Sequence, residues 1–257
     1  MRDIRYALLD PTGNRTVLAE TEVPPAEQPL IAKRIMEREP DAEQVGFVSP
    51  RPDGVAMRMA GGEFCGNATM SAAVLFALDH GIAKGVIPVA VSCQPDPVEV
   101  RVAALPDGRM RGEVDMPRPL SIGEEAFPDG VCRPVVRFRG IAHVILESPL
   151  SRADAEACAP VWCRYLDAAS LGIMTLDRRA GTLLPLVYVP SADTLCWENS
   201  CASGTTAVGA YLAASAGMDT VSLRQPGGTL RVDMREEGRL LLTGTVRLLY
   251  RRTITLA

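Results

Sequence analysis

The chain has 257 residues, of which 47% are hydrophobic and 23% are charged, so its length predicts one or two domains and its composition is that of a globular protein. A formal net charge of −4 and an aromatic content of 5% argue against a nucleic-acid-binding protein, which would need a basic face and stacking side chains. No apolar run reaches the about 20 residues of a membrane span, and the N-terminus lacks the apolar core of a signal peptide, so we expect a cytosolic protein without nucleic-acid or membrane partners.

The side chains that commonly bind cofactors are scarce in this sequence. A pyridoxal phosphate enzyme needs a lysine for its Schiff base, and the two lysines lie in a polar helical stretch (Lys33) and a turn-like segment (Lys84). Two histidines, His80 and His143, and cysteines without a C-x-x-C pair argue against a zinc site. The odd number of cysteines argues against a disulfide framework. We therefore expect neither a cofactor nor a metal.

In chain order, the first elements are a β-like opening at 6–18 and, further on, the motif GGEFCGNAT at 61–69, which contains Cys65. The motif leads into an apolar stretch at 70–78, which predicts a buried helix because few of its positions could face water. Gly81 is a plausible C-terminal cap. Three β-like runs follow, at 86–93, 98–103 and 111–116, with a Pro-Asp-Gly turn at 106–108 before the last.

The Pro-rich stretch from Pro117 to Pro128 indicates a linker, after which the same succession recurs. A β-like run at 138–146 corresponds loosely to the opening of the chain. The motif WENSCASGT at 197–205 contains Cys201 and leads into a second apolar stretch, which predicts another buried helix. That helix spans 206–214 and ends at Gly217, and β-like runs follow at 220–224, 230–234 and 240–247, with turns at 226–228 and 238.

This internal repetition predicts an α+β protein of two homologous, pseudo-symmetric domains. Each domain would be a β-barrel-like sheet around one central helix, because each apolar helix must be covered on all sides. We place the first domain at residues 1–120 and the second at 121–246. The alternative is chance similarity between two helix starts that are rich in small residues.

Each of the two motif cysteines directly precedes small residues at a predicted helix start. The unpaired amides and partial positive charge there favour a thiolate, lowering the cysteine pKa from about 8.5, and the same amides can bind a carboxylate. If the two sites face each other, one thiolate can remove a proton from a carbon while the opposite thiol returns one, which inverts the carbon without a cofactor. The alternative is that Cys65 and Cys201 are buried small hydrophobic residues.

These motifs resemble the diaminopimelate epimerase superfamily of cofactor-independent racemases, and most closely the histidine racemases of staphylopine-type metallophore biosynthesis. The resemblance implies two domains related by a pseudo-twofold axis, a final strand at 247–257 that packs on the first domain, Cys65 and Cys201 as the two bases, and an amino-acid substrate. The matching stretches are PTGN at 11–14, EQVGF at 43–47, GEFCGNATMS at 62–71, LPLVYVP at 184–190, WENSC at 197–201 with SGT at 203–205, and QPGG at 225–228.

The resemblance also implies a set of substrate-contacting residues, each with a structural alternative. Asn14 is a turn former as well as a contact, and Glu43 with Gln44, near the substrate ammonium, could be a solvated helix end. The residues around the cysteines could equally cap the helices, Trp197 and His143 are more typical of packing, and Ala202 stands where the family usually has glycine. The predicted substrate-binding residues are Asn14, Glu43, Gln44, Gly66, Asn67, Glu198, Ala202, Ser203 and Gly204.

The substrate prediction depends on an absence. Diaminopimelate epimerases grip a distal carboxylate with an arginine shortly before the second cysteine, and the segment from Tyr188 to Cys201 contains none. Trp197 and Glu198 instead offer an aromatic face and a hydrogen-bond acceptor that suit an imidazole. We therefore expect conversion of L-histidine to D-histidine for opine metallophore synthesis. Diaminopimelate or proline-type epimerases and a non-catalytic amino-acid-binding protein are the alternatives, and the oligomeric state stays open, with a homodimer as one option.

Overall fold

The computed structural model describes residues 1–236 and 238–256, and the chain forms two compact units. Unit 1 contains Met1–Asp115 together with Thr243–Ala257, and unit 2 contains Met116–Leu242. These limits differ by a few residues from the sequence-based boundaries at 120/121 and 246/247. One reason is that the amide of Met116 donates to the carbonyl of Leu240, 2.9 Å away, which ties the residue before Pro117 to unit 2.

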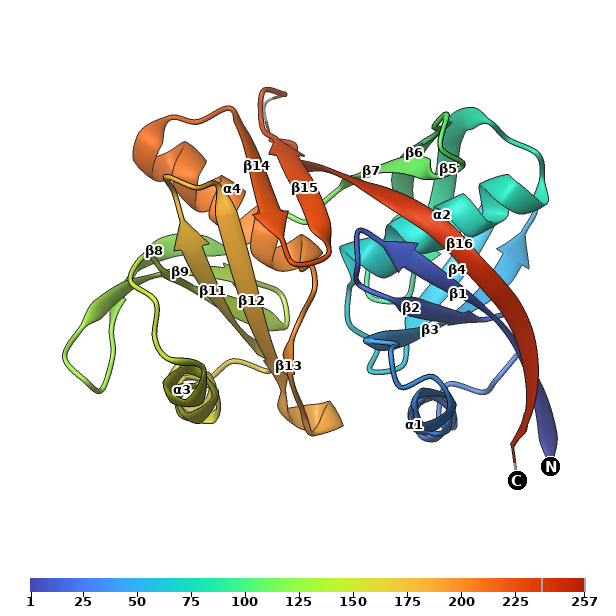
Figure 1. The fold of residues 1–257 in the computed structure, drawn as a ribbon, viewed down its shortest axis with the longest axis horizontal. Coiled ribbons are helices and arrows are strands. Elements are labelled where there is room, and N and C mark those ends of the chain that lie inside the picture. The colour runs from blue at the N-terminus through green and yellow to red at the C-terminus, as the bar shows by residue number, and fades with distance from the viewer. Residues whose placement is uncertain (237, 257) are drawn as a thin grey trace. The chain divides into compact units, whose positions relative to one another are not determined.

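The sheet of unit 1 closes on itself. Its strands follow the order β1-β2-β3-β4-β5-β6-β7-β16, and β16 pairs back onto β1 in antiparallel register, with Arg2 opposite Leu256. Both ends of the chain therefore lie side by side at this pair (Figure 1). Closure leaves no free edge among these strands. They are β1 (Arg2–Pro11), β2 (Thr16–Ala19), β3 (Gln44–Arg51), β4 (Gly54–Met59), β5 (Lys84–Val91), β6 (Val98–Ala104), β7 (Met110–Asp115) and β16 (Leu241–Leu256).

Helix α2 (Gly66–Asp79) is the central helix of unit 1. It packs against β1, β2 and the four strands β4 to β7, and most of its side chains are buried. Figure 1 shows it among the strands, whereas α1 (Gln28–Arg38) lies outside them against β3. The buried helix that the apolar stretch at 70–78 predicts is therefore confirmed. Gly81, just beyond the cap residue His80, has φ +65°, the left-handed conformation that glycine adopts readily.

The sheet of unit 2 has helices on both faces. Its strands follow the order β15-β14-β12-β11-β10-β9-β8, with β13 on β12. Helix α3 (Arg152–Tyr165) packs on one face and α4 (Ala202–Ala216) on the other (Figure 1), and each face has its own hydrophobic cluster. The remaining elements are β8 (Ser121–Ala126), β9 (Cys132–Phe138), β10 (Ile141–Leu146), β11 (Leu171–Asp177), β12 (Thr182–Val189), the 3-10 helix η1 (Pro190–Ala192), β13 (Thr194–Trp197), β14 (Thr220–Gln225) and β15 (Gly228–Asp233).

The two units repeat one succession of elements, as the sequence pattern predicts. Each has a pair of strands, a helix, a second pair of strands, the cysteine-led helix and further strands. The parallel pairings correspond as well: β2 with β3 in unit 1 and β10 with β11 in unit 2 flank the first helix. Around the second helix, β4 pairs with β5 and β12 with β14, again in parallel.

Two sequence-based assignments need correction. The predicted linker at 117–128 contains strand β8, which pairs with β9 and has Ser121 opposite Arg137. Because β8 ends the sheet and is largely exposed, it lacks the apolar alternation by which a strand is recognised. The run predicted at 240–247 and the final strand implied at 247–257 are one continuous strand, β16, which spans Leu241–Leu256. No helix in the described part of the chain is long and apolar enough to cross a membrane.

Candidate active site

The two motif cysteines occupy equivalent positions, each at the N-cap of the buried helix of its unit. Both have extended backbones, with φ −133° and ψ 114° at Cys65 and φ −121° and ψ 111° at Cys201. Each sulfur accepts a hydrogen bond from an amide of the first turn, Ala68 at 3.5 Å and Gly204 at 3.4 Å. The prediction that both thiols lie at helix N-termini is therefore confirmed.

The threonine four residues after each cysteine is part of the same cap. The hydroxyl of Thr69 donates to the carbonyl of Cys65 at 2.7 Å, and that of Thr205 donates to the carbonyl of Cys201 at 2.6 Å. These bonds hold the cysteine backbone against the first helical turn. The Cys-x-x-x-Thr spacing in both motifs thus has a structural cause, and Thr69 takes the capping role rather than a ligand-binding one in this structure.

In unit 1, three of the residues that the resemblance implies meet at Cys65. The Cys65 thiol donates to Oε1 of Gln44 at 3.1 Å, and Nε2 of Gln44 donates to Oδ1 of Asn14 at 2.6 Å. Nδ2 of Asn14 in turn donates to Oε2 of Glu43 at 2.7 Å. Asn14 is buried and also closes a turn, because its amide donates to the carbonyl of Pro11 at 3.2 Å. Gln44 is the first residue of β3, so the alternative of a solvated helix end is wrong for it.

In unit 2, the surroundings of Cys201 raise the pKa of its thiol. Burial raises its pKa well above 9.0, and a hydrogen bond to the Glu198 carboxylate, with the charge of that carboxylate, raises it further. The Ser203 hydroxyl and the Gly204 amide lower it, but by less. The sequence-based expectation of a lowered pKa is therefore wrong for Cys201, because desolvation outweighs the helix N-terminus.

Gly204 allows the close packing around this thiol. A Cβ at position 204 would lie 2.2 Å from the sulfur of Met174 and 3.3 Å from Sγ of Cys201. Met174 on β11 is fully buried, so its side chain has little room to move. A glycine at this point of the first turn of α4 is thus required by the packing under Cys201. Ala202 beside it is also buried.

Sequence reasoning gave no role to Gln225, which the structure places directly on the Cys201 segment. Its Oε1 accepts from the backbone amide of Cys201 at 2.9 Å, and its Nε2 donates to Oγ1 of Thr205 at 2.8 Å. The following turn adds a bond from the Gly227 amide to the Asn199 carbonyl at 2.8 Å. The QPGG turn therefore braces the chain on both sides of residue 200. Its presence among the matching motifs was the only signal in the sequence.

Trp197 packs instead of presenting an open aromatic face. Its indole Nε1 donates to Glu156 at 2.7 Å, and the guanidinium of Arg152 lies 4.7 Å from the ring centroid. Both partners belong to α3, and Trp197 is partly buried against the hydrophobic cluster on that face. The packing interpretation is the one that these contacts support, so Trp197 is a weak candidate for stacking on an imidazole.

His143 is fully buried on β10, and neither of its ring nitrogens has a hydrogen-bond partner. Burial lowers its pKa from 6.5 to about 3, so the imidazole is neutral at physiological pH. It sits beside Gly172 on the neighbouring strand, where a Cβ would lie 2.2 Å from Nδ1. His143 is therefore a packed core residue, as the sequence favours.

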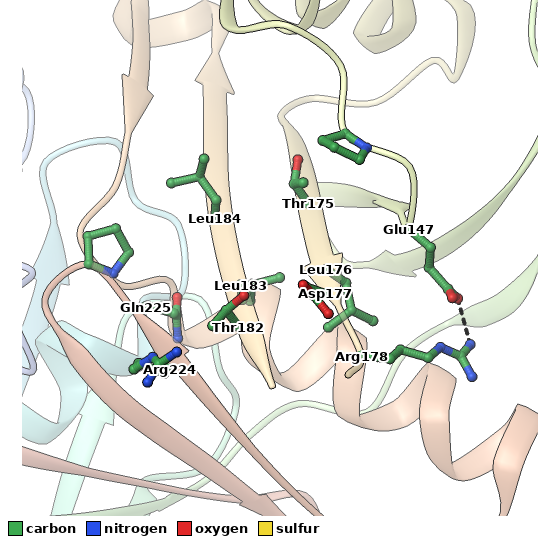
Figure 2. Close-up of a pocket in the computed structure, with 12 residues that line it drawn as sticks. Glu147, Thr175, Leu176, Asp177, Arg178, Thr182, Leu183, Leu184, Arg224 and Gln225 are labelled. Carbon is green, nitrogen blue, oxygen red and sulfur yellow. Dashed lines mark ion pairs between the residues drawn. The ribbon is translucent and has the colours of Figure 1, made fainter. Parts of the chain in front are cut away.

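Unit 2 contains a cavity of about 610 Å³ (Figure 2). It opens beside the ends of β11 and β12, where Arg178 forms an ion pair with Glu147 at 2.6 Å. Gln225 lines it and also bonds the Cys201 backbone, but neither Cys201 nor Glu198 lines it. It is therefore not the predicted substrate site. Among the described residues, no group of three His, Cys, Asp or Glu side chains is placed to hold a metal ion.

Known proteins resemble this chain over most of its length. Residues 3–248 match the family described as Histidine racemase CntK N-terminal domain. The chain is 32% identical to a histidine racemase of Fusobacterium nucleatum subsp. nucleatum, over 88% of this chain and 87% of that protein. It is 27% identical to a histidine racemase of Staphylococcus aureus, covering 89% and 88% of the two chains. A solved structure of a predicted epimerase from Pseudomonas aeruginosa has the same fold, with a TM-score of 0.76 and 18% identity over 99% of this chain and 100% of that one.

Proposed function

This chain belongs to the histidine racemase family, and on that basis we propose that it interconverts L-histidine and D-histidine with Cys65 and Cys201 as the two acid–base groups. That it is an amino-acid racemase, an isomerase, follows from the family. The observation that supports the mechanism is the matched pair of cysteines, each the N-cap of a buried helix with its sulfur at the first-turn amides.

The proposed reaction moves two protons and consumes nothing. One cysteine, as the thiolate, removes the proton from Cα and becomes a thiol, leaving a carbanion that the substrate carboxylate shares. The other cysteine, as the thiol, gives its proton to the opposite face of Cα and becomes a thiolate. The product is the other enantiomer, and the two sulfurs have exchanged states. First-turn amides at Gly66 and at Ser203 would stabilise the negative charge that develops on the carboxylate.

Substrate choice would be decided at the side-chain pocket, since every amino acid has the same α-carboxylate. The segment from Tyr188 to Cys201 contains no arginine to pair with a second carboxylate, and a buried unpaired carboxylate costs several kcal/mol. An imidazole needs only one or two hydrogen-bond partners. Glu198 could be one of them, although in this structure its carboxylate bonds Cys201. The names of the similar proteins from Fusobacterium nucleatum and Staphylococcus aureus support histidine as the substrate.

The test is exchange of the α-proton in deuterium oxide without added cofactor. L-histidine, D-histidine, diaminopimelate, proline and glutamate are compared side by side, with chiral chromatography for inversion and mass spectrometry for deuterium. We expect both histidine enantiomers to gain one deuterium at Cα and to reach a racemic mixture. Faster turnover of diaminopimelate than of histidine would reject the substrate while leaving the mechanism in place.

The resemblance to racemases of metallophore biosynthesis also supports a proposal for the reaction that uses the product. We propose that D-histidine is supplied to a synthase that builds an opine-type metallophore. Deleting the racemase should abolish metallophore production, and added D-histidine, but not L-histidine, should restore it. Restoration by L-histidine would contradict this destination.

A further inference from the structure

A buried threonine beside the Cys65 network determines how that network is oriented. Thr16 is fully buried on β2 and lies opposite Gln44 in the parallel β2–β3 pair. Its hydroxyl donates to the backbone carbonyl of Asn14 at 3.0 Å. Because the Thr16 hydroxyl hydrogen is used in that bond, its oxygen acts as an acceptor toward Gln44, whose Nε2 lies 2.8 Å away.

The other end of the network is fixed in the same sense. The carboxylate of Glu43 accepts the hydrogen bond from Nδ2 of Asn14, so Oδ1 of Asn14 is the atom that faces Gln44. That oxygen accepts the second N–H of the Gln44 amide at 2.6 Å. Both amide hydrogens of Gln44 are thus engaged by acceptors, and its carbonyl Oε1 is left facing Sγ of Cys65 at 3.1 Å.

A carbonyl oxygen accepts a hydrogen bond from a thiol but repels a thiolate. We propose that Thr16 is a positioning residue that, through the Gln44 amide, keeps Cys65 a protonated thiol in the ligand-free enzyme. The inference rests on the proposed function in that Cys65 is one of its two acid–base groups. Thr16 itself touches neither the sulfur nor the substrate in this scheme.

The charges near Cys65 within unit 1 do not depend on Thr16. The ionisable groups on the segments that carry this network are Asp10 and Arg15 on either side of the Asn14 turn, Glu43 before β3, Arg58 on β4 and Glu63 in the loop before α2, and the first turn of α2 has no acidic residue. Arg58 donates to Oε1 of Gln28 at 2.8 Å. Replacing Thr16 leaves all of these in place, so a change at Cys65 would report the orientation of the Gln44 amide.

The experiment measures the pH at which Cys65 becomes reactive. Wild type, Thr16→Val and Thr16→Ser are labelled with iodoacetamide between about pH 6 and pH 11, and labelling is followed peptide by peptide with mass spectrometry. In Thr16→Val the Gln44 amide keeps its bond to Asn14 but loses the second of its two acceptors, so its carbonyl is held less firmly toward the sulfur. We expect the midpoint for Cys65 to fall by about one pH unit. Thr16→Ser keeps the hydroxyl and should match wild type, with the Cys201 peptide as the internal reference.

An unchanged or higher midpoint in folded Thr16→Val would overturn the inference. If that variant does not fold, Thr16→Ala is labelled in its place, because alanine also removes the acceptor from the Gln44 amide. An unchanged or raised midpoint in Thr16→Ala likewise overturns the inference. Labelling does not require turnover, so its outcome is independent of whether histidine is the substrate.

Discussion

The two thiols have the same backbone setting but different neighbours, and this difference is the central feature at the residue scale. Each sulfur accepts a hydrogen bond from a first-turn amide. The other neighbours differ: Cys65 faces the neutral carbonyl of Gln44, whereas Cys201 is buried and faces the Glu198 carboxylate. The helix N-terminus alone would favour a thiolate in both places. At Cys201, burial together with the neighbouring carboxylate therefore outweighs the helix N-terminus.

Both thiols should be needed for inversion. We expect Cys65→Ser and Cys201→Ser each to lower racemisation by roughly 10²–10⁴-fold, the usual contribution of a general acid–base group. The fold should persist because serine is a good N-cap residue. Racemisation of histidine is followed by circular dichroism, and Cys132→Ser, at an exposed position, is the matched control. Near-full activity in either of the first two variants would exclude the two-base mechanism.

His143 should make the fold sensitive to acid. Its folded-state pKa of about 3 lies below the ordinary 6.5, so between these values the unfolded chain binds a proton that the folded chain does not. Stability is fully present above pH 6.5 and falls as the pH decreases, by about 2 kcal/mol at about pH 5.

The variant His143→Leu removes this linkage. We expect urea unfolding to show a smaller loss of stability between pH 7 and about pH 5 in His143→Leu than in wild type. His80→Leu, at an exposed histidine, controls for the loss of an imidazole as such. Equal pH dependence in His143→Leu and wild type would show that His143 is not the group responsible.

The sequence could predict the cysteines but not the residues that orient them. Cys65 and Cys201 are conspicuous because each stands in a small-residue motif before an apolar helix. Thr16 is an ordinary strand residue, and its partner Gln44 is distant in the chain until β2 and β3 pair in parallel. Gln225 accepts a hydrogen bond from the backbone amide of Cys201. Every residue except proline has such an amide, so the sequence around Cys201 does not indicate this contact.

At the scale of elements, burial on all sides is what made α2 and α4 predictable. Both helices are largely buried, so their sequences contain almost no charged residues. The edge strand β8 is mostly exposed and was mistaken for a linker, because its pairing with β9 uses backbone groups. Helix α3 was not predicted, since Pro160 interrupts the helical pattern within it.

The β14–β15 turn should stabilise the start of α4. In Gln225→Ala the amide of Cys201 and the hydroxyl of Thr205 lose the bonds that they make with this side chain. We expect a loss of about 1–3 kcal/mol in the free energy of unfolding, measured with urea, together with reduced racemisation. Gln94→Ala is the matched control, because Gln94 also precedes a proline after a strand of unit 1 and is partly exposed. Equal losses in the two variants would contradict the bracing role.

At the scale of the whole molecule, β16 connects the two units through a single strand. Its first residues belong to unit 2, and from Thr243 onward it belongs to unit 1 and pairs with β1. The sequence suggested a final strand on the first domain only through the family resemblance. Its exposed Arg251 and Arg252 interrupt the alternation of apolar residues by which a strand is recognised.

Removing β16 should damage unit 1 selectively. A chain that ends at Val246 leaves β1 with β2 as its strand partner and removes most of its pairing with β16, which opens the closed sheet and makes edge pairing between molecules available. We expect hydrogen exchange to show lost protection in α2 and retained protection in α4, with increased aggregation. A chain lacking only Ala257 is the control. Equal loss of protection in both helices would show that the two units unfold as one.

The closure of unit 1 by β16 has a consequence for protein synthesis. Because β16 follows all of unit 2 in the chain, a ribosome completes unit 2 before it releases the strand that seals unit 1. The usual order, in which the N-terminal part of a nascent chain folds first, is therefore reversed here. Until translation reaches β16, the edges of β1 and β7 that it pairs with stay open to chaperones, which makes unit 1 the later of the two units to mature.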